Sequence, residues 1–167
     1  MNVKRPVGKR LIGVAALGST LLASISLSLS AATSDDPPLP MQRYSASEIA
    51  SMATAAKPSS SGVSGVQMTN LVGDPTKPGL YTVRVSIAAH TQAKPHVHRD
   101  NRSVTVVSGT WQMGYGAKFD EKALKALPPG SVYTEPAGQA HFSQAGDEAV
   151  VILVTGYGPS DTKFVTN

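Results

Sequence analysis

The sequence contains no cysteine. It therefore has no disulfide framework, no thiol nucleophile and no cysteine that could receive a lipid. A glycine-rich phosphate-binding loop is also absent, as is any segment with the pattern of a βαβ unit. These absences exclude a thiol-dependent enzyme and a doubly wound nucleotide-binding fold.

The net charge of +4 at neutral pH comes entirely from the beginning of the chain. Four basic residues stand there: Lys4, Arg5, Lys9 and Arg10. The rest of the chain has 11 basic and 11 acidic residues and is close to neutral. It lacks the positive footprint of proteins that bind nucleic acids or anionic membranes. We therefore expect no nucleic-acid partner and, once the first segment is removed, no membrane partner.

The same basic residues begin a pattern that is typical of a secretory signal peptide. An apolar run of residues 11–29 follows, and it ends at the small residues Ser30-Ala31-Ala32. A membrane-anchoring helix is the alternative, but glycine and serine dilute the run and a small-residue cleavage pattern follows it. We expect residues 1–32 to be removed and the protein to be periplasmic or secreted.

Residues 33–65 are rich in serine, proline and alanine, and we interpret them as an extended leader. One short helix is expected inside it, because Ser45 and Glu48 form a capping box and Pro58 prevents the helix from continuing. Its apolar face would dock on the folded domain or on a partner subunit, or would belong to a frayed linker helix. That face carries Ile49, Met52 and Ala53.

Residues 66–167 have the pattern of one all-β domain, a sandwich or a barrel, because short β-type segments alternate with turn residues. Val83, Val85 and Ile87 alternate with polar residues, so their strand has one wet and one dry face. Residues 149–155 lack this alternation, which predicts a strand covered on both sides. A small helical insert is expected at 120–127, with Asp120 as N-cap. Further strands are expected at 104–107, 111–115, 131–134 and 162–166.

Three histidines are spaced as ligands of a metal ion. His96 and His98 are two residues apart, which on a strand places both on one face, and His141 follows a distant Pro-x-Gly turn. Two close ligands and one remote ligand are a common way to build an open metal site. The alternative is a pair of strand histidines that form hydrogen bonds at the mouth of a barrel. The fourth histidine, His90, occupies a turn position, where we expect exposure to solvent rather than ligation.

Two segments around these histidines resemble the sequence motifs of the cupin superfamily. The first motif, Gly-x5-His-x-His-x3or4-Glu-x6-Gly, resembles residues 90–109, and the second, Gly-x5-Pro-x-Gly-x2-His-x3-Asn, resembles residues 130–145. The matching positions are His96, His98, Gly109, Gly130, Pro136, Gly138 and His141. Residues 66–167 are thus similar to small single-domain, type-2-like bacterial cupins, a group that is mostly functionally unassigned. The resemblance implies a double-stranded β-helix of jelly-roll type, an internal cavity and a homodimer.

Three positions depart from the cupin motifs. His90 stands in place of glycine, Ala145 in place of asparagine and Arg102 in place of the glutamate ligand. The last is consequential, because a guanidinium stays protonated and cannot bind a metal ion. The remaining three-histidine face is expected to hold divalent iron, manganese, nickel or zinc, with open positions for water or an anionic substrate.

Arg102 has two interpretations at this stage. It binds the carboxylate of a substrate through a bidentate pair, or it forms a structural ion pair with Asp100 or Glu135. Asp100 is also a possible replacement ligand, although its short loop is expected to face water.

A tight turn at Ser108-Gly109 would pair the two flanking strands as a hairpin and set Arg102 opposite Tyr115. We therefore predict Tyr115 as a second substrate contact. In this register, one cavity would be lined by Trp111, Met113 and Tyr115.

We expect an exported cupin that binds a divalent metal ion through His96, His98 and His141 and acts on a small organic, possibly anionic, molecule. Dioxygenase chemistry would follow from iron, and isomerase-like Lewis-acid chemistry from zinc or manganese. The alternative is a non-catalytic module that binds a small ligand, in which Arg102 reflects the loss of an ancestral metal site. The residues alone leave both functions open.

Overall fold

The computed structural model describes residues 38–54, 56–59 and 61–166. The predicted signal peptide, residues 1–32, lies outside the described residues, so its removal and the exported location stay predictions. In the part of the chain that the structure describes, no helix is long and apolar enough to cross a membrane.

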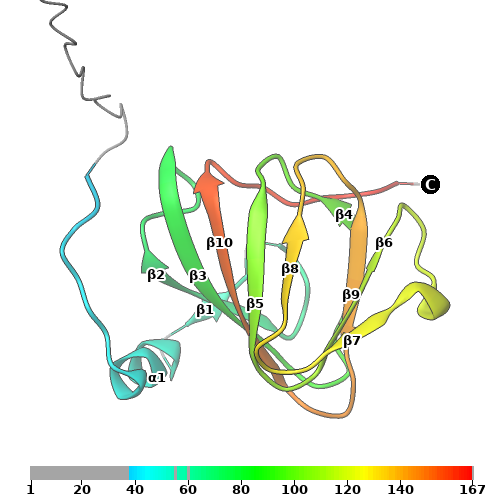
Figure 1. The fold of residues 1–167 in the computed structure, drawn as a ribbon, viewed down its shortest axis with the longest axis horizontal. Coiled ribbons are helices and arrows are strands. Elements are labelled where there is room, and N and C mark those ends of the chain that lie inside the picture. The colour runs from blue at the N-terminus through cyan, green and yellow to red at the C-terminus, as the bar shows by residue number, and fades with distance from the viewer. Residues whose placement is uncertain (1–37, 55, 60, 167) are drawn as a thin grey trace, which may run out of the picture. The chain divides into compact units, whose positions relative to one another are not determined.

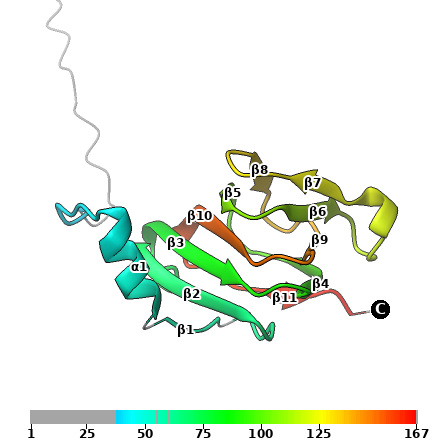
Figure 2. The same cartoon turned by 90° about the horizontal axis from the view of Figure 1, so that it is seen from below.

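Two antiparallel sheets face each other across one core, which confirms the predicted all-β fold (Figures 1 and 2). The first sheet has the strand order β1 (Lys57–Pro58), β2 (Val66–Val72), β3 (Gly79–Ile87), β10 (Val150–Gly158), β5 (Arg102–Ser108) and β8 (Val132–Glu135). The second has the order β11 (Lys163–Phe164), β4 (Gln92–Val97), β9 (His141–Ala145), β6 (Trp111–Tyr115) and β7 (Lys125–Leu127).

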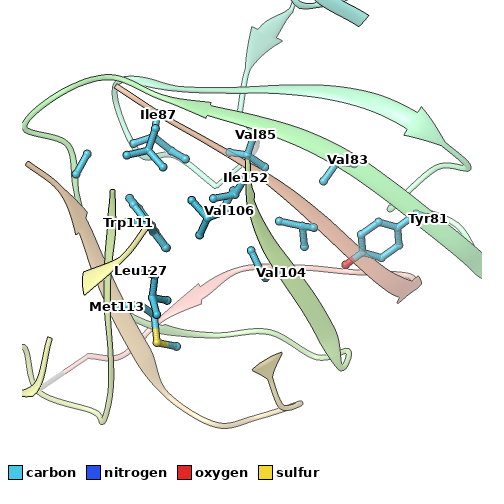
Figure 3. Packing of buried hydrophobic residues seen from close by; sticks show 13 residues of the cluster. Tyr81, Val83, Val85, Ile87, Val104, Val106, Trp111, Met113, Leu127 and Ile152 are labelled. Atoms are coloured by element: carbon cyan, nitrogen blue, oxygen red, sulfur yellow. The ribbon is translucent and has the colours of Figure 1, made fainter. Parts of the chain in front are cut away.

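The core consists mainly of branched apolar side chains from the inner faces of the strands (Figure 3). Along β3, Val83, Val85 and Ile87 are buried and the intervening residues are half-buried, as their alternation predicts. Each such buried side chain stabilises the fold by about 1.5–3 kcal/mol relative to exposure. The prediction for residues 149–155 holds only on the inner face of β10. On its outer face, Val151 and Leu153 are half-buried, so the strand is not fully covered on both sides.

The predicted hairpin between β5 and β6 was wrong. Gly109 does make a tight turn between them, with φ of +71° and a backbone too close to the carbonyl of Ala149 to admit a Cβ. However, β5 pairs with β10 and β8, whereas β6 pairs with β9 and β7. Both strands bury one face in the same core, and the sandwich achieves this by placing them in opposite sheets.

The insert at 120–127 is only partly helical. Asp120 is an N-cap, since its Oδ1 accepts a hydrogen bond of 3.0 Å from the backbone N–H of Lys122. The helix that it caps is a single 3-10 turn, η1 (Glu121–Ala123), and the chain then forms β7. The prediction of a longer helix was wrong because strand pairing with β6 places Leu127 in the core, which outweighs local helix propensity.

The leader contains the predicted helix, α1 (Ala46–Thr54). Its capping box is formed, because the Ser45 N–H donates to Glu48 Oε2 at 2.7 Å and the Glu48 N–H donates to Ser45 Oγ at 3.3 Å. The apolar face of α1 is half-buried, and the helix lies beside β2 (Figure 2). Of the alternatives left open by the sequence, the structure thus shows docking on the domain.

Candidate metal centre

The structure brings the three predicted histidines together at the inner face of the second sheet. His96 in β4 stands directly opposite His141 in β9, and residues paired in this way point to the same face of a sheet. His98 follows β4 by one residue. One ring nitrogen from each of the three lies within 4.8 Å of the others, and all three side chains are buried. This group could hold a metal ion.

Backbone carbonyls determine which ring nitrogen of each histidine carries the proton. In each ring Nδ1 lies within hydrogen-bond distance of a carbonyl oxygen, which can only accept, so Nδ1 is the donor. Nε2 of each neutral ring then carries an unprotonated lone pair, which a metal ligand must provide. The three bonds are His96 to Lys94 O at 2.7 Å, His98 to Asp161 O at 2.6 Å and His141 to Gln139 O at 3.1 Å.

Burial keeps these rings neutral. Loss of solvent lowers the pKa of His96 and of His141 below the usual value, and for His96 the neighbouring His141 lowers it further. The pKa of His98 falls to about 2, because burial and then the positive charge of Arg102 both oppose protonation. Proton competition for the three nitrogens is therefore weak at neutral pH, which favours metal binding.

A buried carboxylate that the sequence interpretation had not placed in this cluster completes one side of it. Glu135, at the end of β8, has Oε2 at 3.4 Å from His98 Nε2 and Oε1 at 3.6 Å from His141 Nε2. The Tyr133 hydroxyl donates to Oε1 at 3.2 Å. Burial raises the pKa of Glu135, while the nearby positive charge of Arg102 lowers it. The sequence signal was an acidic residue in a short β segment immediately before the Pro-x-Gly turn.

Two atoms of the cluster, Glu135 Oε2 and His141 Nε2, are buried and have no hydrogen-bond partner among the described residues. Both are acceptors, because Nδ1 of His141 carries the proton. Buried acceptors without a donor are rare, since each loses the interaction that water would provide. The donor set and these two atoms therefore fit a cation, and the histidines would hold it.

A cavity of about 430 Å³ adjoins the histidines and opens between the two sheets. Its walls are mainly apolar, and His96, His98, Arg102 and Glu135 form a polar region on one side. An apolar cavity with a few convergent polar groups is the usual form of a small-molecule site.

No protein-family model matches the chain. Among curated proteins, the chain is 29% identical over 92 residues to germin-like protein subfamily 1 member 20 of Arabidopsis thaliana and 30% identical to member 16. Each match covers 53% of this chain and 41% of the relative, so the chain spans less than half the length of these relatives.

Solved structures share the architecture. The polyketide cyclase RemF from Streptomyces resistomycificus has a TM-score of 0.58 at 17% identity, covering 77% of this chain and 87% of that one. The cupin-2 domain protein Rru_A2000 from Rhodospirillum rubrum has a TM-score of 0.53 at 18% identity, covering 66% and 72%. The chain has a cupin fold.

Arg102 forms both of the ion pairs that the sequence left open. Its Nε lies 3.5 Å from Asp100 Oδ1 and its Nη1 lies 3.6 Å from Glu135 Oε2. Nη2 donates to Ser160 Oγ at 2.6 Å and to Asp161 O at 3.0 Å. The guanidinium is thus bound by the protein itself, although it still lines the cavity, and a contact with substrate stays a prediction.

Asp100 does not face water as expected. It is 7% exposed, and its Oδ2 accepts a hydrogen bond of 2.6 Å from the Tyr81 hydroxyl. Burial raises the pKa of Tyr81 to about 12, so this phenol remains a donor. Asp100 forms no ion pair with a histidine among the described residues. It therefore balances Arg102, and it does not belong to the group of described residues that could share a metal ion.

The remaining predicted residues are divided between cavity, core and surface. Trp111 lines the cavity and donates from Nε1 to the Tyr133 hydroxyl at 3.0 Å, and Met113 is buried in the core. Tyr115 is 52% exposed, donates to Thr134 O at 2.7 Å and is not part of the cavity wall. Its predicted substrate contact depended on the wrong hairpin register. His90 is exposed in a turn, as expected, at 3.7 Å from Asp147.

Proposed function

We propose that this cupin binds a divalent iron, manganese, nickel or zinc ion through His96, His98 and His141 and acts on a small organic molecule in the adjoining cavity. The observation that carries the proposal is the convergence of three neutral imidazoles, one ring nitrogen of each lying within 4.8 Å of the others, beside an apolar cavity. When bound, such an ion supplies Lewis-acid chemistry or, for iron, redox chemistry with dioxygen, of the isomerase or dioxygenase kind.

The protein residues have separate tasks in this proposal. The backbone carbonyls hold the imidazoles in one tautomer, and the apolar walls exclude water from the ligand. Arg102, Asp100 and Glu135 together carry a net charge of −1 when ionised. A divalent ion would change the charge of this buried cluster to +1, so an anionic ligand would be attracted only to the metal-loaded protein. We infer that a small organic anion is the substrate class.

We further propose that the protein works in the periplasm or outside the cell as a homodimer. The signal-peptide pattern of residues 1–32 supports export, and the cupin resemblance supports the dimer. Light scattering coupled to size exclusion tests the second point, and a monomer at micromolar concentration would contradict it.

A second function, a non-catalytic module that binds a small ligand without metal, is favoured by one observation. Arg102 occupies the position of the cupin glutamate and is engaged in ion pairs, as expected of a metal site that has been lost. In that case the cavity alone would be the functional feature.

Metal analysis distinguishes the two functions. We would measure the metal content of untagged protein, of the variant His96→Ala, His98→Ala, and of His90→Ala as a matched control. His90 is an exposed histidine outside the cluster. Near-stoichiometric metal in the wild type and the control, lost in the double variant, supports the metal-dependent function. A wild type that stays without metal after reconstitution supports the binding module.

A further inference from the structure

The side chain opposite Arg102 on the neighbouring strand is Glu135. Residues directly opposite each other in an antiparallel pair project from the same face of the sheet. The cupin motif places its acidic ligand at position 102, so this chain has a cation there and a carboxylate one strand away. The acidic group is therefore displaced from β5 to β8 and still points toward the histidines.

The distances from Glu135 to His98 and His141 match those between ligands of a shared ion, whereas no contact of this length joins Glu135 to His96 among the described residues. Two ligand atoms that each lie about 2.1 Å from one ion, at a tetrahedral angle, are about 3.4 Å apart. Glu135 Oε2 lies 3.4 Å from His98 Nε2, and Glu135 Oε1 lies 3.6 Å from His141 Nε2. A hydrogen bond does not explain these contacts. The rings of His98 and His141 donate from Nδ1, so their Nε2 atoms and the carboxylate oxygens of Glu135 are all acceptors.

The neighbours of Glu135 hold its carboxylate in one orientation but leave one of its oxygens without a hydrogen bond. The Tyr133 hydroxyl donates to Oε1, and Arg102 Nη1 is 3.6 Å from Oε2, which leaves Oε2 without a hydrogen bond among the described residues. His141 Nε2 is the other atom without one. A cation bound by both atoms would satisfy both, because it accepts an electron pair from each.

We propose that Glu135 is the fourth ligand of the metal centre, supplied by β8 in place of the glutamate that the cupin motif puts at position 102. Arg102 is then a positioning residue that holds the carboxylate in place. This inference rests on the proposed three-histidine site. The competing explanation is that Glu135 serves only as the structural ion-pair partner of Arg102.

Glu135→Gln tests the inference, because it retains the size of the side chain and removes the charge. Asp100→Asn is the matched control, since Asp100 is also buried and paired with Arg102 but forms no ion pair with a histidine. The affinity of the full chain for Zn²⁺ and Co²⁺ would be measured by competition with a chromophoric chelator. The visible spectrum of the Co²⁺ form would report the ligand set.

Removing an outer partner of a metal ligand commonly weakens binding about 10- to 100-fold. We expect Glu135→Gln to weaken metal binding more than about 100-fold and to change the Co²⁺ spectrum. Asp100→Asn should weaken binding less than about tenfold and leave the spectrum unchanged. If Glu135→Gln does not fold, as judged by circular dichroism, Glu135→Asp replaces it. That variant keeps the charge but withdraws the carboxylate by one methylene, and the same loss is expected.

The outcomes separate the two proposals. A wild type that binds neither ion overturns both the three-histidine site and the role of Glu135. A wild type that binds tightly, with Glu135→Gln or Glu135→Asp within about 100-fold of it or with an unchanged Co²⁺ spectrum, overturns only the ligand role of Glu135.

Discussion

Metal removal should lower the thermal stability of this protein by a measurable amount. The histidines come from β4, from the residue after it and from β9. Nδ1 of His98 is hydrogen-bonded to the backbone carbonyl of Asp161, near the C-terminal strand. An ion held by these residues connects segments that separate on unfolding, so it binds the folded state selectively. At a free metal concentration 100 times the Kd, binding adds about 2.7 kcal/mol to the free energy of unfolding.

This free energy corresponds to a shift in Tm. For a domain of this size we take about 3–5 °C per kcal/mol, between the values for smaller and larger domains, so the shift is about 8–13 °C. Trp111 is the only tryptophan in the chain and lines the cavity, so its fluorescence reports unfolding directly. Thermal scans would compare protein with chelator and protein with excess Zn²⁺, Mn²⁺, Ni²⁺ or Fe²⁺, the last under anaerobic conditions.

The variants provide the controls for this measurement. His90→Ala should retain the shift, and the variant His96→Ala, His98→Ala should lose it. Equal Tm values for the wild type with chelator and with all four ions would refute the reasoning. A shift of similar size in the double variant would place the metal elsewhere in the protein.

Three further predictions concern acid, charge and ligand. Without metal, the free energy of unfolding should fall as the pH drops below about 6.5, where the unfolded state protonates its histidines but the folded state, with lowered pKa values, does not. The slope reaches about 1.4 kcal/mol per pH unit for each histidine, and Glu135, whose pKa is raised, opposes it at lower pH. Urea midpoints at pH 7 and pH 5 check this, and equal values would contradict it. Arg102→Met should destabilise the fold by about 3–5 kcal/mol in urea unfolding, because two buried carboxylates lose their counter-charge; a loss below about 1 kcal/mol would show that the ion pairs contribute little. Finally, a small dicarboxylate should change Trp111 fluorescence only in the metal-loaded protein, and an equal change in the metal-free protein would argue for the binding module.

Several features of this protein followed from local patterns. The alternation in β3 predicted its buried face, and the capping box predicted the start of α1. The spacing of His96 and His98, with the turn before His141, predicted the cluster. Strand parity and helix caps could be predicted because they depend on neighbouring residues. The motif spacing could be used because it indicates that His141 comes back beside His96 and His98.

The sequence by itself thus determined an all-β domain with three histidines on one face. Only the tertiary structure decided which strands pair, and with them the neighbours of each polar side chain. Arg102 was expected opposite Tyr115 but lies opposite Glu135, because β5 and β6 belong to different sheets. Pairing between distant strands depends on how their apolar faces fill a shared core, which no local pattern specifies. For this reason the sequence predicted the three histidines, while the carboxylate beside them became visible only in the fold.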